Sequence, residues 1–169
     1  MIELRTPRLL LRRARSDDLE AMHAVLSDER AMTYWTCAPH TDLSQTREWL
    51  DSMLASTPEE SEDFVITLGG ETIGKIGAYR LPDFGYILSP RYWGLGLASE
   101  AMTAFLAHAF ARDDITRLTA DIDPRNEASI RLIKRHGFVE TGRASGTWTT
   151  HLGLCDSIYF ALEKADYRT

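Results

Sequence analysis

The chain has 169 residues, of which 44% are hydrophobic and 26% charged, a composition typical of one folded domain and not of a disordered chain. The net charge of -6 argues against a broad nucleic-acid-binding surface. The two cysteines, Cys37 and Cys155, form no CxxC pair, so neither a zinc ribbon nor a redox pair is indicated. We find no signal-peptide pattern and no run of about 20 apolar residues, and therefore expect a cytoplasmic protein without membrane association.

Hydrophobic periodicity in the first half of the chain predicts a strand, two helices and three further strands. Ser16 is the expected N-cap of the first helix, whose apolar face includes Leu19, Met22 and Leu26. Gly69-Gly70 marks a turn between two strands. The strands are expected at residues 9–13, 64–68, 72–79 and 84–88, and the second helix, capped by Thr41-Asp42, at residues 43–54.

The second half of the chain continues with alternating helices and strands. Gly137 follows the second of these helices in the position typical of a helix end. Nothing in the composition marks a linker, so we predict one domain over residues 1–169, of the α+β (mixed α/β) class. The helices are expected at residues 97–111 and 127–135, and the strands at 116–122 and, as two closing strands, from residue 138 to 162.

The most informative segment is a glycine-rich turn between a strand and a helix, with the sequence Tyr-Trp-Gly-Leu-Gly-Leu-Ala at residues 92–98. Glycines at such a turn let backbone N–H groups surround an anion, and the helix N-terminus adds about half a positive charge. The turn therefore suits a phosphate or a pyrophosphate. It lacks the Gly-Lys-Ser/Thr of a Walker A loop, and Ser99 replaces the third glycine of a dinucleotide fingerprint. Glycines that serve packing alone are the alternative.

This turn resembles the acetyl-CoA motif of the GNAT superfamily of N-acetyltransferases, Gln/Arg-x-x-Gly-x-Gly/Ala. Arg91, Gly94 and Gly96 satisfy the motif literally; in the register we prefer, Gly96 and Ala98 supply its second half and Trp93 replaces the Gln or Arg. A Tyr-Trp-Gly sequence is frequent here in the RimJ/RimL-like branch. Residues 123–138 are similar to that branch's Asn-x-x-Ser…Gly-Phe element, and residues 4–12 to its opening T-x-R-L-x-L-R.

The resemblance implies a GNAT-type domain, with a twisted, mostly antiparallel sheet, a splayed parallel strand pair and flanking helices. It further implies an enzyme that transfers an acetyl group from acetyl-CoA, as co-substrate, to a primary amine by direct attack on the thioester, without a metal. The acceptor is a small molecule or the N-terminus of a peptide or protein, and a homodimeric assembly is left open. The alternatives are a non-catalytic acyl-CoA sensor with this fold and an interaction domain.

The resemblance also assigns the residues that hold the cofactor. They come from the strand before the turn, the turn itself and the start of each following helix. The alternative for Asn126 is a helix N-cap, and for Ser129 an ordinary first-turn residue bonded to the backbone. The predicted cofactor-binding residues are Ile87, Leu88, Ser89, Trp93, Gly94, Leu95, Gly96, Leu97, Ala98, Ser99, Asn126 and Ser129.

The resemblance is less specific about catalysis. Many GNAT enzymes protonate the leaving thiolate with a Tyr seven residues after the Asn, but this chain has Ile133 there, so Ser129 is the predicted acid. For the general base we favour Asp121 and His151, and we leave Asp123, Asp156 and a relaying water open. An aromatic acceptor pocket is expected from Tyr34, Trp35 and Trp148, although core packing is the alternative for Trp35.

Overall fold

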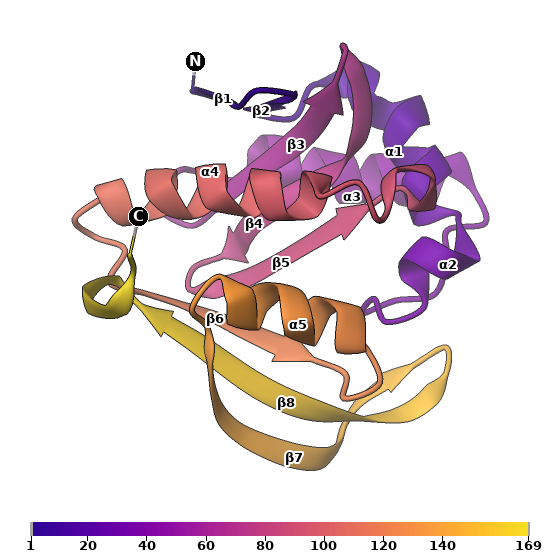
Figure 1. Cartoon of the computed structure of the whole chain (residues 1–169). Coiled ribbons are helices and arrows are strands. Elements are labelled where there is room, and N and C mark those ends of the chain that lie inside the picture. The colour runs from indigo at the N-terminus through magenta and orange to yellow at the C-terminus, as the bar shows by residue number, and fades with distance from the viewer. Residues whose placement is uncertain (1, 169) are drawn as a thin grey trace.

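A single sheet of eight strands forms the centre of the computed structural model, which describes residues 2–168 (Figure 1). The strand order is β1-β2-β3-β4-β5-β6-β8-β7, and every neighbouring pair is antiparallel except β5 and β6, which are parallel. The predicted fold class is confirmed. The strands are β1 (Glu3–Arg5), β2 (Leu9–Arg12), β3 (Glu62–Leu68), β4 (Glu71–Arg80), β5 (Asp83–Leu88), β6 (Arg117–Ile122), β7 (Val139–Thr150) and β8 (Gly153–Glu163).

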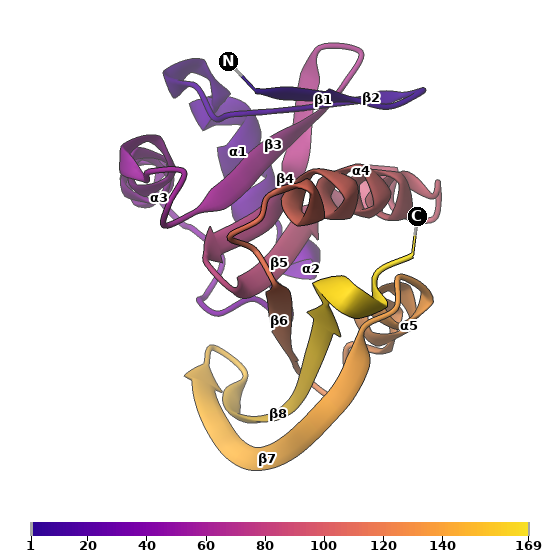
Figure 2. The same cartoon turned by 90° about the vertical axis from the view of Figure 1, so that its left-hand side faces the viewer.

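Helices cover both faces of the sheet (Figures 1 and 2). α4 and α5 pack on one face around Phe64, Phe84 and Phe105, and α1, α2 and α3 pack on the other around Val65 and Ile87. No helix within residues 2–168 is long and apolar enough to span a membrane. The helices are α1 (Leu19–Leu26), α2 (Glu29–Met32), α3 (Leu43–Ala55), α4 (Leu97–Ala111) and α5 (Glu127–Arg135), with short 3₁₀ turns at Ser16–Asp18, Pro90–Tyr92 and Lys164–Asp166.

The sequence missed β1 and α2, which are only three and four residues long. It also placed the first N-cap wrongly at Ser16. A 3₁₀ turn fills residues 16–18, α1 begins at Leu19, and the Asp18 carboxylate accepts the hydrogen bond from the Arg15 N–H. The same Asp18 carboxylate forms a buried ion pair with Arg12, at 2.7 Å, which holds it in position to accept this hydrogen bond. The predicted cap of α3 at Asp42 and the helix end at Gly137 are both confirmed.

The parallel strands β5 and β6 separate almost as soon as they meet. Asp83 and Thr119 are their one paired position, and the Thr119 hydroxyl donates to the Asp83 carboxylate at 3.0 Å. Below this point the ring of Phe84 stacks on Phe105 of α4 at 5.3 Å and on Phe138, which follows α5, at 5.6 Å. This aromatic packing fills the base of the gap, and the two strands diverge beyond it (Figure 2).

The divergence leaves the end of β5 paired with β4 on one edge and without a strand on the other edge, where β6 would lie. The Ser89 N–H donates to the Ile73 carbonyl of β4. Since successive residues of an antiparallel strand point their N–H and C=O groups to opposite edges, Leu88 directs its own groups toward the β6 side. These groups lie beyond the single β5–β6 pair and face the gap.

A buried charge cluster links the C-terminal end of α4 to the start of β3. The Glu62 side chain is 1% exposed and bonds to Arg13, His108 and Arg112. Burial alone would raise the pKa of Glu62, but the His108 hydrogen bond and the arginine charges lower it below its ordinary value. The carboxylate is therefore held ionised in the interior by its three basic partners.

We predict that Glu62→Ala destabilises the protein by about 3 kcal/mol, because it removes a fully buried carboxylate that three partly buried basic groups share. Chemical denaturation measures this loss. As the matched control, Glu3→Ala removes an exposed ion pair with Arg5 and should change the free energy of unfolding by no more than about 0.5 kcal/mol. Equal effects of the two substitutions would contradict the assignment.

Candidate active site

A cleft of about 720 Å³ opens where β5 ends and α4 begins, with α5 as its far wall. The separation of β5 from β6 provides the floor of this cleft, and α2 closes it from the other side of the sheet. The residues that line it are Arg30, Ala31, Thr33, Tyr34, Trp35, Tyr86, Ile87, Leu88, Tyr92, Trp93, Gly94, Gly96, Leu97, Ala98, Ser99, Asn126, Ala128, Ser129, Leu132 and Arg135. Ten of the twelve predicted cofactor-binding residues lie here; Ser89 and Leu95 do not.

The glycine turn has the backbone of an anion-binding loop. Gly94 and Gly96 have φ angles of 75° and 76°, which only glycine adopts without strain, and Leu95 between them does not. Such alternation directs successive N–H groups to one side. Gly96 is the N-cap of α4 and offers no capping side chain, so the first-turn N–H groups of the helix stay available for a ligand.

Trp93 connects the turn to the end of β5. Its indole N–H donates to the Leu88 carbonyl at 2.8 Å, so one of the two Leu88 backbone groups that face the gap is bound and the amide is left. Arg91, the alternative first position of the motif, instead lies 3.8 Å from Glu71 and outside the cleft. This placement supports the register in which Trp93 holds the first motif position.

The start of α5 brings two polar side chains to the cleft. The Asn126 side-chain oxygen accepts from the Ser129 N–H at 3.2 Å, so Asn126 is the N-cap of α5, and its amide nitrogen stays available. The Ser129 hydroxyl lies beside the Tyr86 phenol. Burial raises the pKa of Tyr86, and its contact with Ser129 opposes that rise, so the phenol is neutral at pH 7. Ser129 itself is only 8% exposed.

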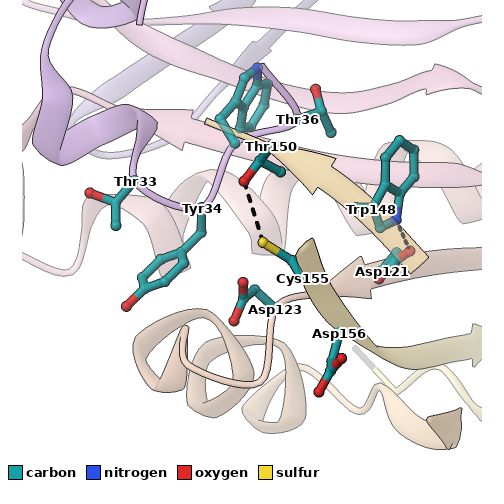
Figure 3. A pocket seen from close by; sticks show the side chains of 10 residues that line it. Thr33, Tyr34, Thr36, Asp121, Asp123, Trp148, Thr150, Cys155 and Asp156 are labelled. Atoms are coloured by element: carbon teal, nitrogen blue, oxygen red, sulfur yellow. Dashed lines mark hydrogen bonds between the residues drawn. The ribbon is translucent and has the colours of Figure 1, made fainter. Parts of the chain in front are cut away.

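A second, smaller cavity of about 70 Å³ adjoins the cleft and shares Thr33, Tyr34 and Trp35 with it (Figure 3). It combines aromatic rings with three carboxylates that come from β6, its end and β8. The residues that line it are Thr33, Tyr34, Trp35, Thr36, Asp121, Asp123, Trp148, Thr150, Cys155 and Asp156.

The three carboxylates of this cavity have different partners. Asp123 forms an ion pair with Arg125 at 2.5 Å, which lowers the pKa of Asp123 and makes it a weak base. Asp121 accepts a hydrogen bond from the Trp148 indole at 2.7 Å (Figure 3), and Asp156 accepts one from the Gly146 N–H at 2.8 Å. Within residues 2–168, neither Asp121 nor Asp156 forms an ion pair, so the structure leaves both as candidates for the general base.

The structure gathers all but one of the predicted catalytic and acceptor residues. Ser129 lies in the cleft, Asp121 and Trp148 in the second cavity, and Tyr34 and Trp35 in both. His151 lies apart from them, exposed in the turn between β7 and β8, and lines neither cavity.

Sequence reasoning missed two functional candidates. Tyr86 lines the cleft beside Ser129, and strand alternation places it on the same face as Phe84 and Leu88, a signal that was present in the sequence. Cys155 lies buried in the second cavity, where the Arg125 guanidinium is 3.2 Å from its sulfur; no sequence spacing indicated that contact.

Comparison with known proteins identifies the family. Residues 8–139 match the acetyltransferase (GNAT) domain, so the chain belongs to the GNAT acetyltransferases, as its motifs predicted. It is 27% identical over 176 residues to the N-acetyltransferase p20 of Bacillus licheniformis, covering 99% of each chain. It is 26% identical over 138 residues to the spermidine N(1)-acetyltransferase of Escherichia coli K12, covering 78% of this chain and 73% of the relative.

Solved structures share the fold. RimL, the ribosomal L7/L12 α-N-protein acetyltransferase, in complex with coenzyme A, superposes with a TM-score of 0.86 at 22% identity, over 96% of this chain and 98% of RimL. The spermidine N-acetyltransferase of Vibrio cholerae, in complex with CoA and spermine, superposes with a TM-score of 0.83 at 19% identity, over 96% and 99%. A ribosomal-protein acetyltransferase thus has the same architecture as this chain.

His136 connects α5 to the first turn of α4. Its Nε2 lies 2.8 Å from the Ser99 hydroxyl. Burial, with the nearby Arg135 charge, lowers the pKa of His136 below its ordinary value of 6.5. A histidine whose pKa is lowered in the folded state is protonated at a lower pH than the same histidine in the unfolded chain. The unfolded chain therefore binds more protons in this pH range, and acid favours unfolding.

We predict that the free energy of unfolding falls as the pH decreases from about 6.5 to 5, and that His136→Asn makes this decrease shallower. His40, whose pKa is also lowered by burial and by His23, should contribute the remaining slope. Urea denaturation across this pH range measures both effects. His151→Asn, in the exposed turn, is the control and should leave the slope unchanged; a wild-type slope in His136→Asn would refute the assignment.

Proposed function

We propose that the protein transfers the acetyl group of acetyl-CoA to a primary amine by direct attack of the amine on the thioester. The observation that carries this proposal is the meeting of two cavities at Thr33, Tyr34 and Trp35. One holds an anion-binding turn and the predicted acid, and the other holds carboxylates and aromatic rings. A thioester at Leu88 would lie between them.

The cleft fits the chemical parts of acetyl-CoA. The N–H groups of Gly96 and the first turn of α4 suit the pyrophosphate, because they are backbone donors at a positive helix end. The pantetheine arm suits the gap between β5 and β6, where Asn126 faces it. The Leu88 amide, which points to the open edge of β5 where β6 has diverged, is the donor proposed for the oxyanion that forms on the thioester carbonyl. RimL and the Vibrio cholerae enzyme bind CoA on the same fold, which supports this placement.

The second cavity is the proposed acceptor site. Its carboxylates attract an ammonium group, and the rings of Tyr34, Trp35 and Trp148 offer π-faces to a cation. Such an acceptor is a small-molecule amine or the N-terminus of a peptide or protein. Relatives act on amines of both kinds: one is a spermidine N(1)-acetyltransferase and another a ribosomal L7/L12 α-N-protein acetyltransferase.

Asp121 and Ser129 account for the proton transfers of the proposed reaction. The acceptor ammonium first loses a proton to Asp121, directly or through water, and the neutral amine then forms a bond with the acetyl carbon. The tetrahedral intermediate collapses as the carbon–sulfur bond breaks, and the Ser129 hydroxyl donates a proton to the thiolate. The nitrogen of the acetylated product still carries one proton more than the acetamide, and this proton passes through solvent to the Ser129 alkoxide. The products are the acetamide and CoA, with one proton released for each ammonium consumed.

We predict that Ser129→Ala lowers kcat at least tenfold, of the order expected for loss of a proton donor, while the KM for acetyl-CoA changes by less than about threefold. Thiol release in the presence of an amine panel measures both constants. Ser52→Ala, on the exposed face of α3, is the control. An unchanged kcat in Ser129→Ala would remove Ser129 from the acid role.

We predict that Asp121→Asn lowers kcat/KM for a cationic amine at least tenfold, because it removes both the proposed base and a charge contact to the ammonium, and leaves the KM for acetyl-CoA unchanged. The substitution keeps the hydrogen bond to Trp148, so the cavity wall stays intact. Asp17→Asn, an exposed change remote from both cavities, serves as the control. A rise in the KM for acetyl-CoA alone would show that Asp121 contacts the cofactor, and would contradict its role in binding the amine.

The same assay separates an enzyme from a CoA-binding sensor. Wild-type protein that binds CoA but releases no thiol with any member of a panel of peptides, polyamines, amino acids and aminoglycosides would contradict the catalytic proposal. Thiol release that depends on one class of amine would identify the acceptor.

A further inference from the structure

The segment before β2 is bound to the first turn of α4, although the two lie more than 90 residues apart in sequence. The Thr6 hydroxyl donates to one Glu100 carboxylate oxygen at 2.5 Å, and the Arg8 N–H donates to the same oxygen at 3.0 Å. The Arg8 Nε–H donates to the other oxygen at 2.7 Å. Glu100 thus uses both of its oxygens to hold this segment.

Arg8 makes one further contact, and it is to the glycine turn. Its NH1 group donates to the Leu95 carbonyl at 2.9 Å. The guanidinium therefore bridges the Glu100 carboxylate and the backbone of the turn. Burial alone would raise the pKa of Glu100, but hydrogen bonds from Thr6 and Arg8 lower it, so the carboxylate stays charged and keeps the bridge in place.

This contact determines where the next amide points. A peptide unit is planar and trans, so its carbonyl oxygen and its amide hydrogen point in opposite directions. With the Leu95 oxygen bound to Arg8, the Gly96 N–H must point away from Arg8. Gly96 lines the cleft, whereas Leu95 and Arg8 do not, so this N–H is directed to the cleft side of the turn.

The 95–96 peptide needs such a fixed partner. Rotation of this unit changes mainly ψ of Leu95 and φ of Gly96, and glycine tolerates nearly any φ. A Cβ at Gly96 would have the Arg8 guanidinium as its one near neighbour, at 3.6 Å, so Arg8 is the side chain that lies against this part of the turn. Without Arg8, the carbonyl oxygen would face the cleft in part of the population and repel an anion there.

We propose that Arg8 is a positioning residue for the pyrophosphate of acetyl-CoA: it orients the 95–96 peptide so that the Gly96 N–H faces the cleft. Glu100 and Thr6 hold Arg8 in place. This inference rests on the proposed function, since it concerns the same cofactor site. It also gives the Thr6 and Arg8 positions of the opening sequence motif a physical role.

The test compares CoA binding with turnover of a thioester that lacks the pyrophosphate. Isothermal titration with CoA and kinetics with S-acetylpantetheine are measured for the wild type, Arg8→Met and Arg8→Lys. Both variants should bind CoA about tenfold more weakly, as expected for one oriented hydrogen bond to a charged group. The kcat/KM for S-acetylpantetheine should stay within about twofold of wild type, because that substrate does not reach the turn.

Arg8→Lys distinguishes orientation from charge. Lysine keeps the positive charge but offers no planar set of donors to bridge a carboxylate and a carbonyl. Wild-type CoA affinity in Arg8→Lys would overturn the proposal in favour of simple electrostatic attraction. Arg5→Met is the matched control, because Arg5 is exposed and pairs with Glu3 within β1; it should bind CoA as the wild type does.

Three further outcomes bear on the proposal. An equal loss of activity with S-acetylpantetheine and acetyl-CoA would show that Arg8 supports the fold in general, and would contradict the proposal. If Arg8→Met does not fold, Glu100→Gln replaces it; this variant weakens the hold on the guanidinium and should give the same pattern at about threefold. Failure of wild-type protein to bind CoA would instead refute the proposed function itself.

Discussion

The early separation of β5 from β6 is the constraint on which the cleft depends. One paired position, Asp83 with Thr119, holds the two strands together, and Phe84 packs between Phe105 and Phe138 directly below it. Had the ladder continued, β6 would bind the Leu88 amide and fill the gap. The sheet therefore lacks hydrogen bonds between β5 and β6 beyond this pair. Their absence exposes a backbone donor and opens the cleft of about 720 Å³.

The elements around the gap contribute different chemistry. The helices on one face supply the polar groups for the cofactor: α4 its N-terminus and α5 the Asn126–Ser129 pair. The segment after α2, the end of β6 and the β7–β8 hairpin supply the aromatic and acidic side chains of the second cavity (Figure 3). The buried charges at Glu62 stabilise the remote end of α4. Under the proposed assignment of the cleft to acetyl-CoA and the second cavity to the amine, the acceptor side could vary without a change in how the cofactor is held.

Local chemistry could be predicted from the sequence, and long-range contacts could not. Gly94, Gly96 and the Asn126 cap were predictable because each answers a local backbone requirement: a positive φ or an unpaired helix N–H. The second cavity was only partly predictable, because Asp121 and Trp148 meet through a hydrogen bond between residues 27 positions apart. The exposed position of His151 follows from the turn that joins β7 to β8, whose place the hydrophobic pattern did not define.

The central claim is that backbone amides at the start of α4 and the end of β5 hold acetyl-CoA. Amide NMR spectra of the labelled protein, titrated with CoA, test this most directly. The account predicts the largest shifts at residues 94–99 and 87–89. Saturable binding that leaves these amides unshifted and perturbs another surface would contradict it.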